Sequence, residues 1–134
     1  MPGYSGTPLP KKLGIKDGFR FHLLDAPPEV LRELKASLRQ CEAIEDANTP
    51  IDFAMIFTKS DATLTKDLKR IAKQLAPAGM LWISWPKKSS GVPTELNENI
   101  VREIGLASGL VDVKVCAVTD VWSGLKFVRR LKDR

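Results

Sequence analysis

The sequence predicts a three-layer α/β/α sandwich with a Rossmann-like, mostly parallel sheet that is closed by a C-terminal antiparallel β-hairpin. Short apolar runs with strand character alternate with segments whose apolar residues recur at helical spacing, from residue 19 to residue 104. Two strand-like segments then follow each other without an intervening helix. The length of 134 residues, with 43% hydrophobic and 28% charged residues, indicates a single domain over residues 1–134.

The first predicted elements are an arm, a strand and a helix. Three prolines and two glycines within the first ten residues predict an extended N-terminal arm over residues 1–17. Residues 19–24 are apolar at their end and are followed by a proline-containing turn, which predicts a strand. The next helix begins near Pro28 and buries Leu34 and Leu38. We expect a short strand over residues 41–45.

The middle of the chain predicts two strands separated by a helix. Residues 51–58 are almost wholly apolar, which is typical of a parallel strand that is covered on both faces. Ser60 or Asp61 is the expected cap of the helix that follows, and a turn over residues 77–79 ends that helix. The strand predicted next, residues 80–85, is also apolar.

The last third of the chain predicts one helix and the hairpin. Thr94 is the expected helix cap, and Gly109 follows the helix end. Valines alternate with other residue types over residues 111–116, and a turn near residues 120–124 leads into a final strand over residues 125–131. These two strands form the predicted hairpin.

The composition narrows the class of protein. Cys41, Cys116 and His22 are the only thiols and imidazole, too few for a four-ligand zinc site built on cysteine and histidine, so we assign no metal site. We expect both thiols to be reduced. The first twenty residues lack the apolar core of a signal peptide, and no segment has the length of a membrane span, so we expect a cytoplasmic protein without a membrane partner.

The best candidate site is the basic, hydroxyl-rich loop of residues 86–91, which follows an apolar strand. Loops at strand ends are the usual binding places in α/β proteins, and cationic side chains there favour an anionic small molecule or partner. Trp82 and Trp85 are three positions apart, so they face opposite sides of the sheet, and only the latter can border the site. The predicted binding residues in this region are Trp85, Lys87, Lys88, Ser89 and Ser90.

Four sequence blocks stand out along the chain: GYSGTPL with KLG (residues 3–9 and 12–14), LWISWPKK (81–88), GLVDVKVCAV (109–118) and WSGLK (122–126). On these blocks the chain resembles a small bacterial family catalogued only as a domain of unknown function. The family resemblance covers nearly the full chain and implies no activity. The order of elements resembles, more distantly, class I methyltransferases.

The methyltransferase-like order raises the question of an S-adenosylmethionine or dinucleotide site. Such a site needs glycines after the first strand, but here the turn is Asp25-Ala26-Pro27-Pro28, which lacks two backbone donors. Glu45 and Asp46 lie about twenty residues further on, where these folds place the acid that binds ribose hydroxyls. Asp25 and Glu45 therefore stay candidate ligand-binding residues, with no cofactor assigned.

No catalytic group can be assigned from the sequence. His22 lies within a strand without an identifiable partner, and Cys116 lies among strand-forming residues; neither Ser84 nor Ser123 has the glycine-flanked setting of a hydrolase nucleophile. The leading hypothesis is a non-enzymatic or degenerate Rossmann-like domain that binds an anion at residues 86–91. The alternatives are a shortened methyltransferase-like enzyme and a nucleic-acid-binding module that uses the basic chain ends.

Overall fold

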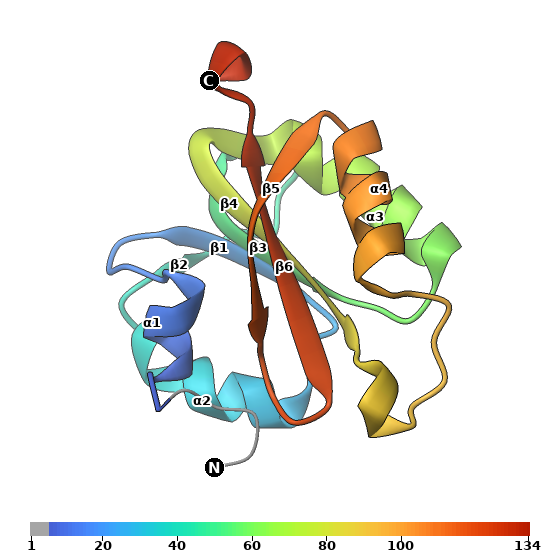
Figure 1. Cartoon of the computed structure of the whole chain (residues 1–134). Coiled ribbons are helices and arrows are strands. Elements are labelled where there is room, and N and C mark those ends of the chain that lie inside the picture. The colour runs from blue at the N-terminus through green and yellow to red at the C-terminus, as the bar shows by residue number, and fades with distance from the viewer. Residues whose placement is uncertain (1–5) are drawn as a thin grey trace.

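The computed structural model describes residues 6–134, and over this range the chain forms one six-stranded sheet, four α-helices and two short 3-10 helices (Figure 1). The strands are β1 (Arg20–Leu24), β2 (Glu42–Ala43), β3 (Ile51–Phe57), β4 (Leu75–Pro86), β5 (Leu110–Ala117) and β6 (Trp122–Arg129). The helices are α1 (Leu9–Leu13), α2 (Pro28–Leu38), α3 (Asp61–Gln74) and α4 (Glu98–Ala107), with 3-10 helices η1 (Lys88–Ser90) and η2 (Leu131–Asp133).

The sheet has the strand order β2-β1-β3-β4-β6-β5. The pairs β2–β1, β1–β3 and β3–β4 are parallel, whereas β6 pairs antiparallel with both β4 and β5. This topology confirms the predicted parallel sheet with a closing hairpin. None of the helices formed by residues 6–134 has both the length and the apolarity that crossing a bilayer requires.

The sheet is covered on both faces, which makes three layers (Figure 1). On one face α1 and α2 pack against the sheet, and Leu13 and Leu34 are fully buried there. On the other face lie α3 and α4, with Leu68 and Val101 buried. Side chains of β3 alternate between the two clusters, as expected for a strand that is covered on both sides.

The expected N-terminal arm is wrong for part of its length, because Leu9–Leu13 is a helix. Pro8 and Pro10 lie at the N-cap and within the first turn, where a missing N–H removes no intrahelical hydrogen bond, and Gly14 ends the helix with φ 84°. Leu9 and Leu13 are buried against the sheet. Residues 1–5 of the expected arm, and with them part of the first sequence block, lie outside the described residues.

The turn expected over residues 77–79 is also different, because α3 passes directly into β4 at Leu75. The pairing jumps from Ile51 with Leu75 to Phe53 with Met80, so the intervening residues form a bulge within the strand. A Cβ atom at Gly79 would lie 2.6 Å from the carbonyl oxygen of Ile51. The glycine is therefore needed for close approach to the neighbouring backbone.

The helix caps confirm one expectation and correct another. The hydroxyl of Ser60 accepts the amide of Thr63 at 3.3 Å and caps α3 as predicted. The cap of α4 is Asn97, whose side-chain oxygen accepts the amide of Ile100 at 2.9 Å. Thr94, the residue predicted for this position, instead donates its hydroxyl to the carbonyl of Lys59. Asparagine is a stronger cap than threonine, and it lies nearer the apolar stripe of the helix.

Candidate functional site

The candidate site lies at the sheet edge where the parallel strands β1, β3 and β4 end. The chain passes from β1 to β2 on one side and returns to β3 on the other, so the direction of winding changes between β1 and β3. In open α/β sheets, ligands bind outside the strand ends at such a switch point. The residues that follow these three strands are Asp25, Thr58 with Lys59, and Lys87.

The loop after β1 is poorly suited to the usual phosphate contacts. Asp25 has a left-handed φ of 57°, and the helix begins immediately afterwards with Pro27 as N-cap and Pro28 as first residue. Of the four N–H groups that a helix start normally leaves free, these prolines remove two. The amide of Val30 donates to the carbonyl of Pro27, which leaves the amide of Glu29. An anion at this helix start would therefore meet few backbone donors.

Asp46, the second residue of the acidic pair that follows β2, has a structural role. The carboxylate of Asp46 accepts the amides of Asn48 and Thr49 at 2.8 and 2.7 Å and the Thr49 hydroxyl at 2.8 Å. Hydrogen bonds from Thr49, then Asn48, lower the pKa of Asp46 below its ordinary value. The carbonyls of Asp46 and Thr49 accept the side-chain amide of Gln74. Asp46 therefore begins a hydrogen-bonded turn.

This turn lies at the opposite end of the sheet from the candidate loop. Gln74 directly precedes Leu75, which pairs with Ile51 at the start of β3. The candidate loop follows the far end of β4, at Pro86. Glu45 directly precedes this turn and follows β2, which pairs with the first two residues of β1, whereas Asp25 follows the last residue of β1 and shares the edge of the candidate loop.

The loop of residues 86–91 is held in one conformation by its own hydrogen bonds. The amide of Lys87 donates to the carbonyl of Val121 at 2.8 Å, which ties the loop to the hairpin turn. The hydroxyl of Ser90 donates to the carbonyl of Lys87 at 2.7 Å and accepts the amide of Val92. Gly91 ends the loop with φ 76°. Ser90 is thus occupied within the loop, while Lys88 and Ser89 are exposed.

The two tryptophans of β4 lie in opposite clusters, as predicted from their spacing. Trp82 packs on the side of α1 and α2, and Trp85 on the side of α3 and α4. Trp85 is only 4% exposed and directly precedes Pro86, so it packs in the core beneath the point where the loop begins. Ser84, next to it, is buried and donates its hydroxyl to the carbonyl of Ser123 at 2.7 Å.

Lys59 belongs to this edge and was missed by the sequence analysis. Phe57 pairs with Ser84. Lys59 and Pro86, each two positions further along the chain, therefore lie at the same level of adjacent strands. The backbone carbonyl of Lys59 accepts hydrogen bonds from the amide of Glu95 and the hydroxyl of Thr94. Within residues 6–134, the side chains of Lys59, Lys87 and Lys88 make no hydrogen bond or ion pair. The sequence signal was a polar Thr-Lys-Ser run at the end of a buried strand.

Within residues 6–134, neither His22 nor Cys116 makes a hydrogen bond to another side chain. His22 bonds through Nδ1 to the carbonyl of Ile44 at 2.7 Å, and its buried Nε2 has no partner among the described residues. Burial raises the pKa of the Cys116 thiol, and the nearby Lys12 and Lys114 only partly offset this effect. Over the part of the chain that the structure describes, no three His, Cys, Asp or Glu residues form a metal-binding group.

Lysines of the hairpin, Lys114 and Lys126, lie near Lys12 and Lys16 beside α1. The ammonium of Lys12 donates to the carbonyl of Ala117 at 2.8 Å, and that of Lys114 donates to the carbonyl of Lys12 at 3.3 Å. Lys126 lies close to Lys114 and Lys16, and burial, followed by repulsion from these two lysines, lowers its pKa. A second cationic surface therefore exists on the face that carries α1.

Residues 24–131 match the model of a family described as "Protein of unknown function (DUF3052)". No curated protein matches the sequence. The family match bears out the resemblance drawn from the four sequence blocks and, like it, names no activity.

Solved structures with the same fold are methyltransferase-like. The Methanococcus jannaschii fibrillarin pre-rRNA processing protein aligns with a TM-score of 0.54 and 17% identity over 92% of this chain and 69% of its own. Magnesium protoporphyrin IX methyltransferase (ChlM) from Synechocystis PCC 6803, with bound SAH, aligns with a TM-score of 0.57 and 11% identity over 91% of this chain and 78% of its own. LepI in complex with SAM aligns with a TM-score of 0.56 and 15% identity over 92% of this chain. The chain spans about half (47%) of LepI. These likenesses establish the fold.

Proposed function

The chain belongs to the DUF3052 family of proteins of unknown function, and for this member we propose a non-enzymatic role, the binding of an anionic small molecule or an anionic group of a partner. The site is the loop of residues 86–91 together with Lys59. Within it Lys87, Lys88 and Ser89 carry the contacts. Trp85 and Ser90 support the loop from within the fold.

One observation carries this proposal. The ends of the adjacent strands β3 and β4 present three lysine side chains that no acidic group of residues 6–134 pairs. An ammonium that is not neutralised by the protein is available for a charge-assisted hydrogen bond to phosphate or carboxylate. The hydroxyl of the exposed Ser89 adds a neutral donor beside them.

The methyltransferase-like alternative has weaker support from the site. The fold is similar to that of proteins solved with SAM or SAH, but the prolines at the start of α2 remove donors that such ligands use. Glu45, the acid expected to bind a ribose, follows a strand that pairs only with the first two residues of β1. We therefore propose that this edge has lost the standard cofactor contacts and keeps a binding role through β3 and β4.

Calorimetric titration at low salt tests the proposal with pyrophosphate, adenosine monophosphate and S-adenosylhomocysteine as probes. The proposal expects pyrophosphate and adenosine monophosphate to bind and S-adenosylhomocysteine to show no measurable binding. Lys87→Ala with Lys88→Ala should weaken phosphate binding by about tenfold or more, since a hydrogen bond to a charged group contributes roughly 1.5–3 kcal/mol.

Lys35→Ala with Arg39→Ala is the matched control, because both side chains are exposed on the opposite face and the change in charge is the same. The proposal expects this control to bind like the wild type. Equal affinity of the wild type and the Lys87/Lys88 double variant would remove the loop from the site. Tight binding of S-adenosylhomocysteine would restore the methyltransferase-like alternative.

The cationic surface around Lys12, Lys16, Lys114 and Lys126 favours a second candidate function, binding of a nucleic acid. Burial, followed by repulsion from Lys114 and Lys16, lowers the pKa of Lys126, and a phosphate backbone bound here would offset the repulsion between these lysines. The measurement is the affinity for a short RNA against salt concentration. RNA affinity that falls steeply as salt is added, with a smaller salt dependence in the Lys114→Ala with Lys126→Ala variant, supports this function. Absent binding, or binding that does not depend on salt, contradicts it.

A further inference from the structure

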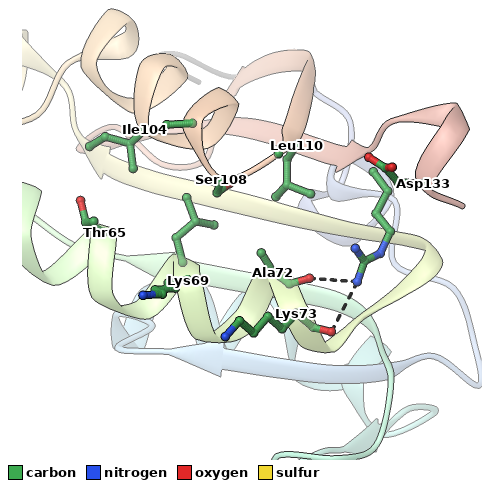
Figure 2. Close-up of a pocket in the computed structure, with 12 residues that line it drawn as sticks. Thr65, Lys69, Ala72, Lys73, Ile104, Ser108, Leu110 and Asp133 are labelled. Carbon is green, nitrogen blue, oxygen red and sulfur yellow. Dashed lines mark hydrogen bonds between the residues drawn. The ribbon is translucent and has the colours of Figure 1, made fainter.

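A groove of about 510 Å³ lies between α3 and α4, at the end of the molecule where the C-terminal strand finishes (Figure 2). It is separate from the candidate loop, because its walls come from the later turns of both helices, the start of β5 and the end of β6. Its size falls within the range of roughly 300–1,000 Å³ that is typical of small-molecule sites.

The interior of the groove is apolar. Leu68 and Ala72 come from α3, Ile104 and Ala107 from α4, and Leu110 from the start of β5. Figure 2 shows Ile104 and Leu110 directed across the groove toward α3. The wall is therefore suited to a hydrocarbon group, whose removal from water is the main source of affinity in such sites.

Arg129, which also lines the groove, uses its Nε and Nη2 donors within the protein. Its guanidinium donates to the carbonyls of Ala72 at 2.9 Å, Lys73 at 3.5 Å and Leu75 at 3.0 Å, and so satisfies the C-terminal end of α3. The positive charge of Arg129 remains at the wall, but its geometry is set by the backbone. This residue therefore shapes the groove and contributes a fixed charge.

The rim is basic on the α3 side. Lys69 and Lys73 line the groove from one turn to the next, both are exposed, and neither makes a hydrogen bond or ion pair through its side chain within residues 6–134. Asp133 is the acidic side chain of the lining, against three basic ones. The charge along the rim thus complements an anion.

We propose that this groove binds a small amphipathic organic acid, with its hydrocarbon part between α3 and α4 and its carboxylate at Lys69 and Lys73. The apolar interior and the basic rim are adjacent, so one molecule of this kind satisfies both. An uncharged hydrocarbon leaves the lysines without a counter-ion, and a cationic amphiphile meets three basic side chains.

The test uses the full chain and the probes hexanoate, octanoate and decanoate, with decyltrimethylammonium as the cationic counterpart. Affinity measured by calorimetry should rise along the acid series, by up to about fourfold for each methylene that becomes fully buried. The cation should not bind measurably. Absence of saturable binding by decanoate, or a preference for the cation, would overturn the proposal.

Two variants place the ligand. Lys69→Ala with Lys73→Ala should weaken decanoate binding about five- to tenfold, as expected for the loss of two exposed charge interactions. The control is Lys66→Ala with Arg70→Ala, which removes the same charge from the same helix but from residues that line only the neighbouring hollow. Equal losses in the two double variants would contradict a site at the groove and indicate a general effect of charge.

Ala107→Trp tests the apolar part directly. Ala107 is exposed at the end of α4, so a large side chain there should fill the groove without entering the core. The variant should keep the melting temperature of the wild type, and its affinity for decanoate should fall at least tenfold. The Lys87→Ala with Lys88→Ala variant should bind decanoate with wild-type affinity. Unchanged decanoate affinity in Ala107→Trp would refute the site. The site would also be refuted if the protein bound anionic lipid vesicles but showed no binding of free decanoate.

Discussion

The indole nitrogen of Trp82 donates a hydrogen bond to the carbonyl oxygen of Leu13 at 2.9 Å, and both residues are fully buried. This bond joins α1 to the middle of β4. It shows that the N-terminal helix is part of the core on the α2 face. Leu13 is the last residue of α1, so its carbonyl has no acceptor role within the helix. The indole therefore supplies the hydrogen-bond donor that this buried carbonyl would otherwise lack.

We therefore expect Leu13→Ala to lower the free energy of unfolding by about 2–5 kcal/mol, the usual cost of emptying a fully buried leucine site. Urea denaturation followed by tryptophan fluorescence measures this change. Leu31→Ala on α2 is the control, since Leu31 is 43% exposed and should cost much less. A loss no larger than that of the control would show that α1 is not part of the core.

A second prediction concerns Gly105, which lies within α4 against the ring of Phe127. A Cβ atom at residue 105 would lie 2.1 Å from Cε2 of that ring. Gly105→Ala should therefore destabilise the protein by about 1–3 kcal/mol, although alanine alone favours a helix by roughly 1 kcal/mol. Adding Phe127→Leu should recover part of this loss in urea denaturation. A stabilised Gly105→Ala protein would contradict the contact.

The third prediction is acid sensitivity through Asp52. Arg20 donates its guanidinium to this carboxylate at 3.0 and 3.1 Å and its amide at 2.8 Å. These bonds, led by the side-chain ones, hold the pKa of Asp52 below its ordinary value, with burial partly opposing them. A carboxylate whose folded pKa is lowered stabilises the fold above its unfolded pKa, and this contribution is lost as pH falls through the folded value.

Unfolding free energy measured against pH should therefore decline below about pH 4, the ordinary range of an aspartate. Asp52→Asn should be less stable than the wild type at neutral pH and should show a shallower decline in acid. Glu33→Gln, at an exposed position, is the control and should follow the wild-type curve. Parallel acid profiles for Asp52→Asn and the wild type would rule out this linkage.

The fourth prediction is the low reactivity of Cys116 at neutral pH. Burial raises the pKa of this thiol, so little thiolate is present to react. In a Cys41→Ser background, alkylation by iodoacetamide should be slow near pH 7 and should rise at alkaline pH. Lys114→Ala should move this rise to higher pH, because Lys114 lowers the pKa. Fast alkylation at neutral pH would show that the thiol is neither buried nor raised in pKa.

Much of the fold was predictable, because periodicity reports burial. The apolar run of β3 and the amphipathic helices α2 and α3 occur where their patterns indicate them. The alternation in β5 correctly predicts a strand, but Val113 and Val115 are exposed, so it does not report burial there. The sequence analysis failed at α1 and at residues 75–79, where proline and glycine punctuation suggested an arm and a turn. In both places long-range contacts, Leu13 with Trp82 and Gly79 with Ile51, determine the local structure.

The site was predictable only in its strand-end loop. Lys87 and Lys88 follow β4 as expected, but Lys59 joins them through strand pairing, a relation that sequence order does not show. Glu45 has the spacing of a ribose-binding acid, yet it follows a strand that pairs only with the start of β1, and the chain turns back directly after it. The groove between α3 and α4 depends on helix packing and had no sequence signal.

The most direct test of the proposed anion site is an amide NMR titration of the isotope-labelled protein with pyrophosphate at low salt. Binding at the edge formed by β3 and β4 predicts that the largest shift changes occur at Lys59 and at residues 87–91. Unmoved amides at these positions, or changes confined to the region of Lys12, Lys114 and Lys126, would contradict it.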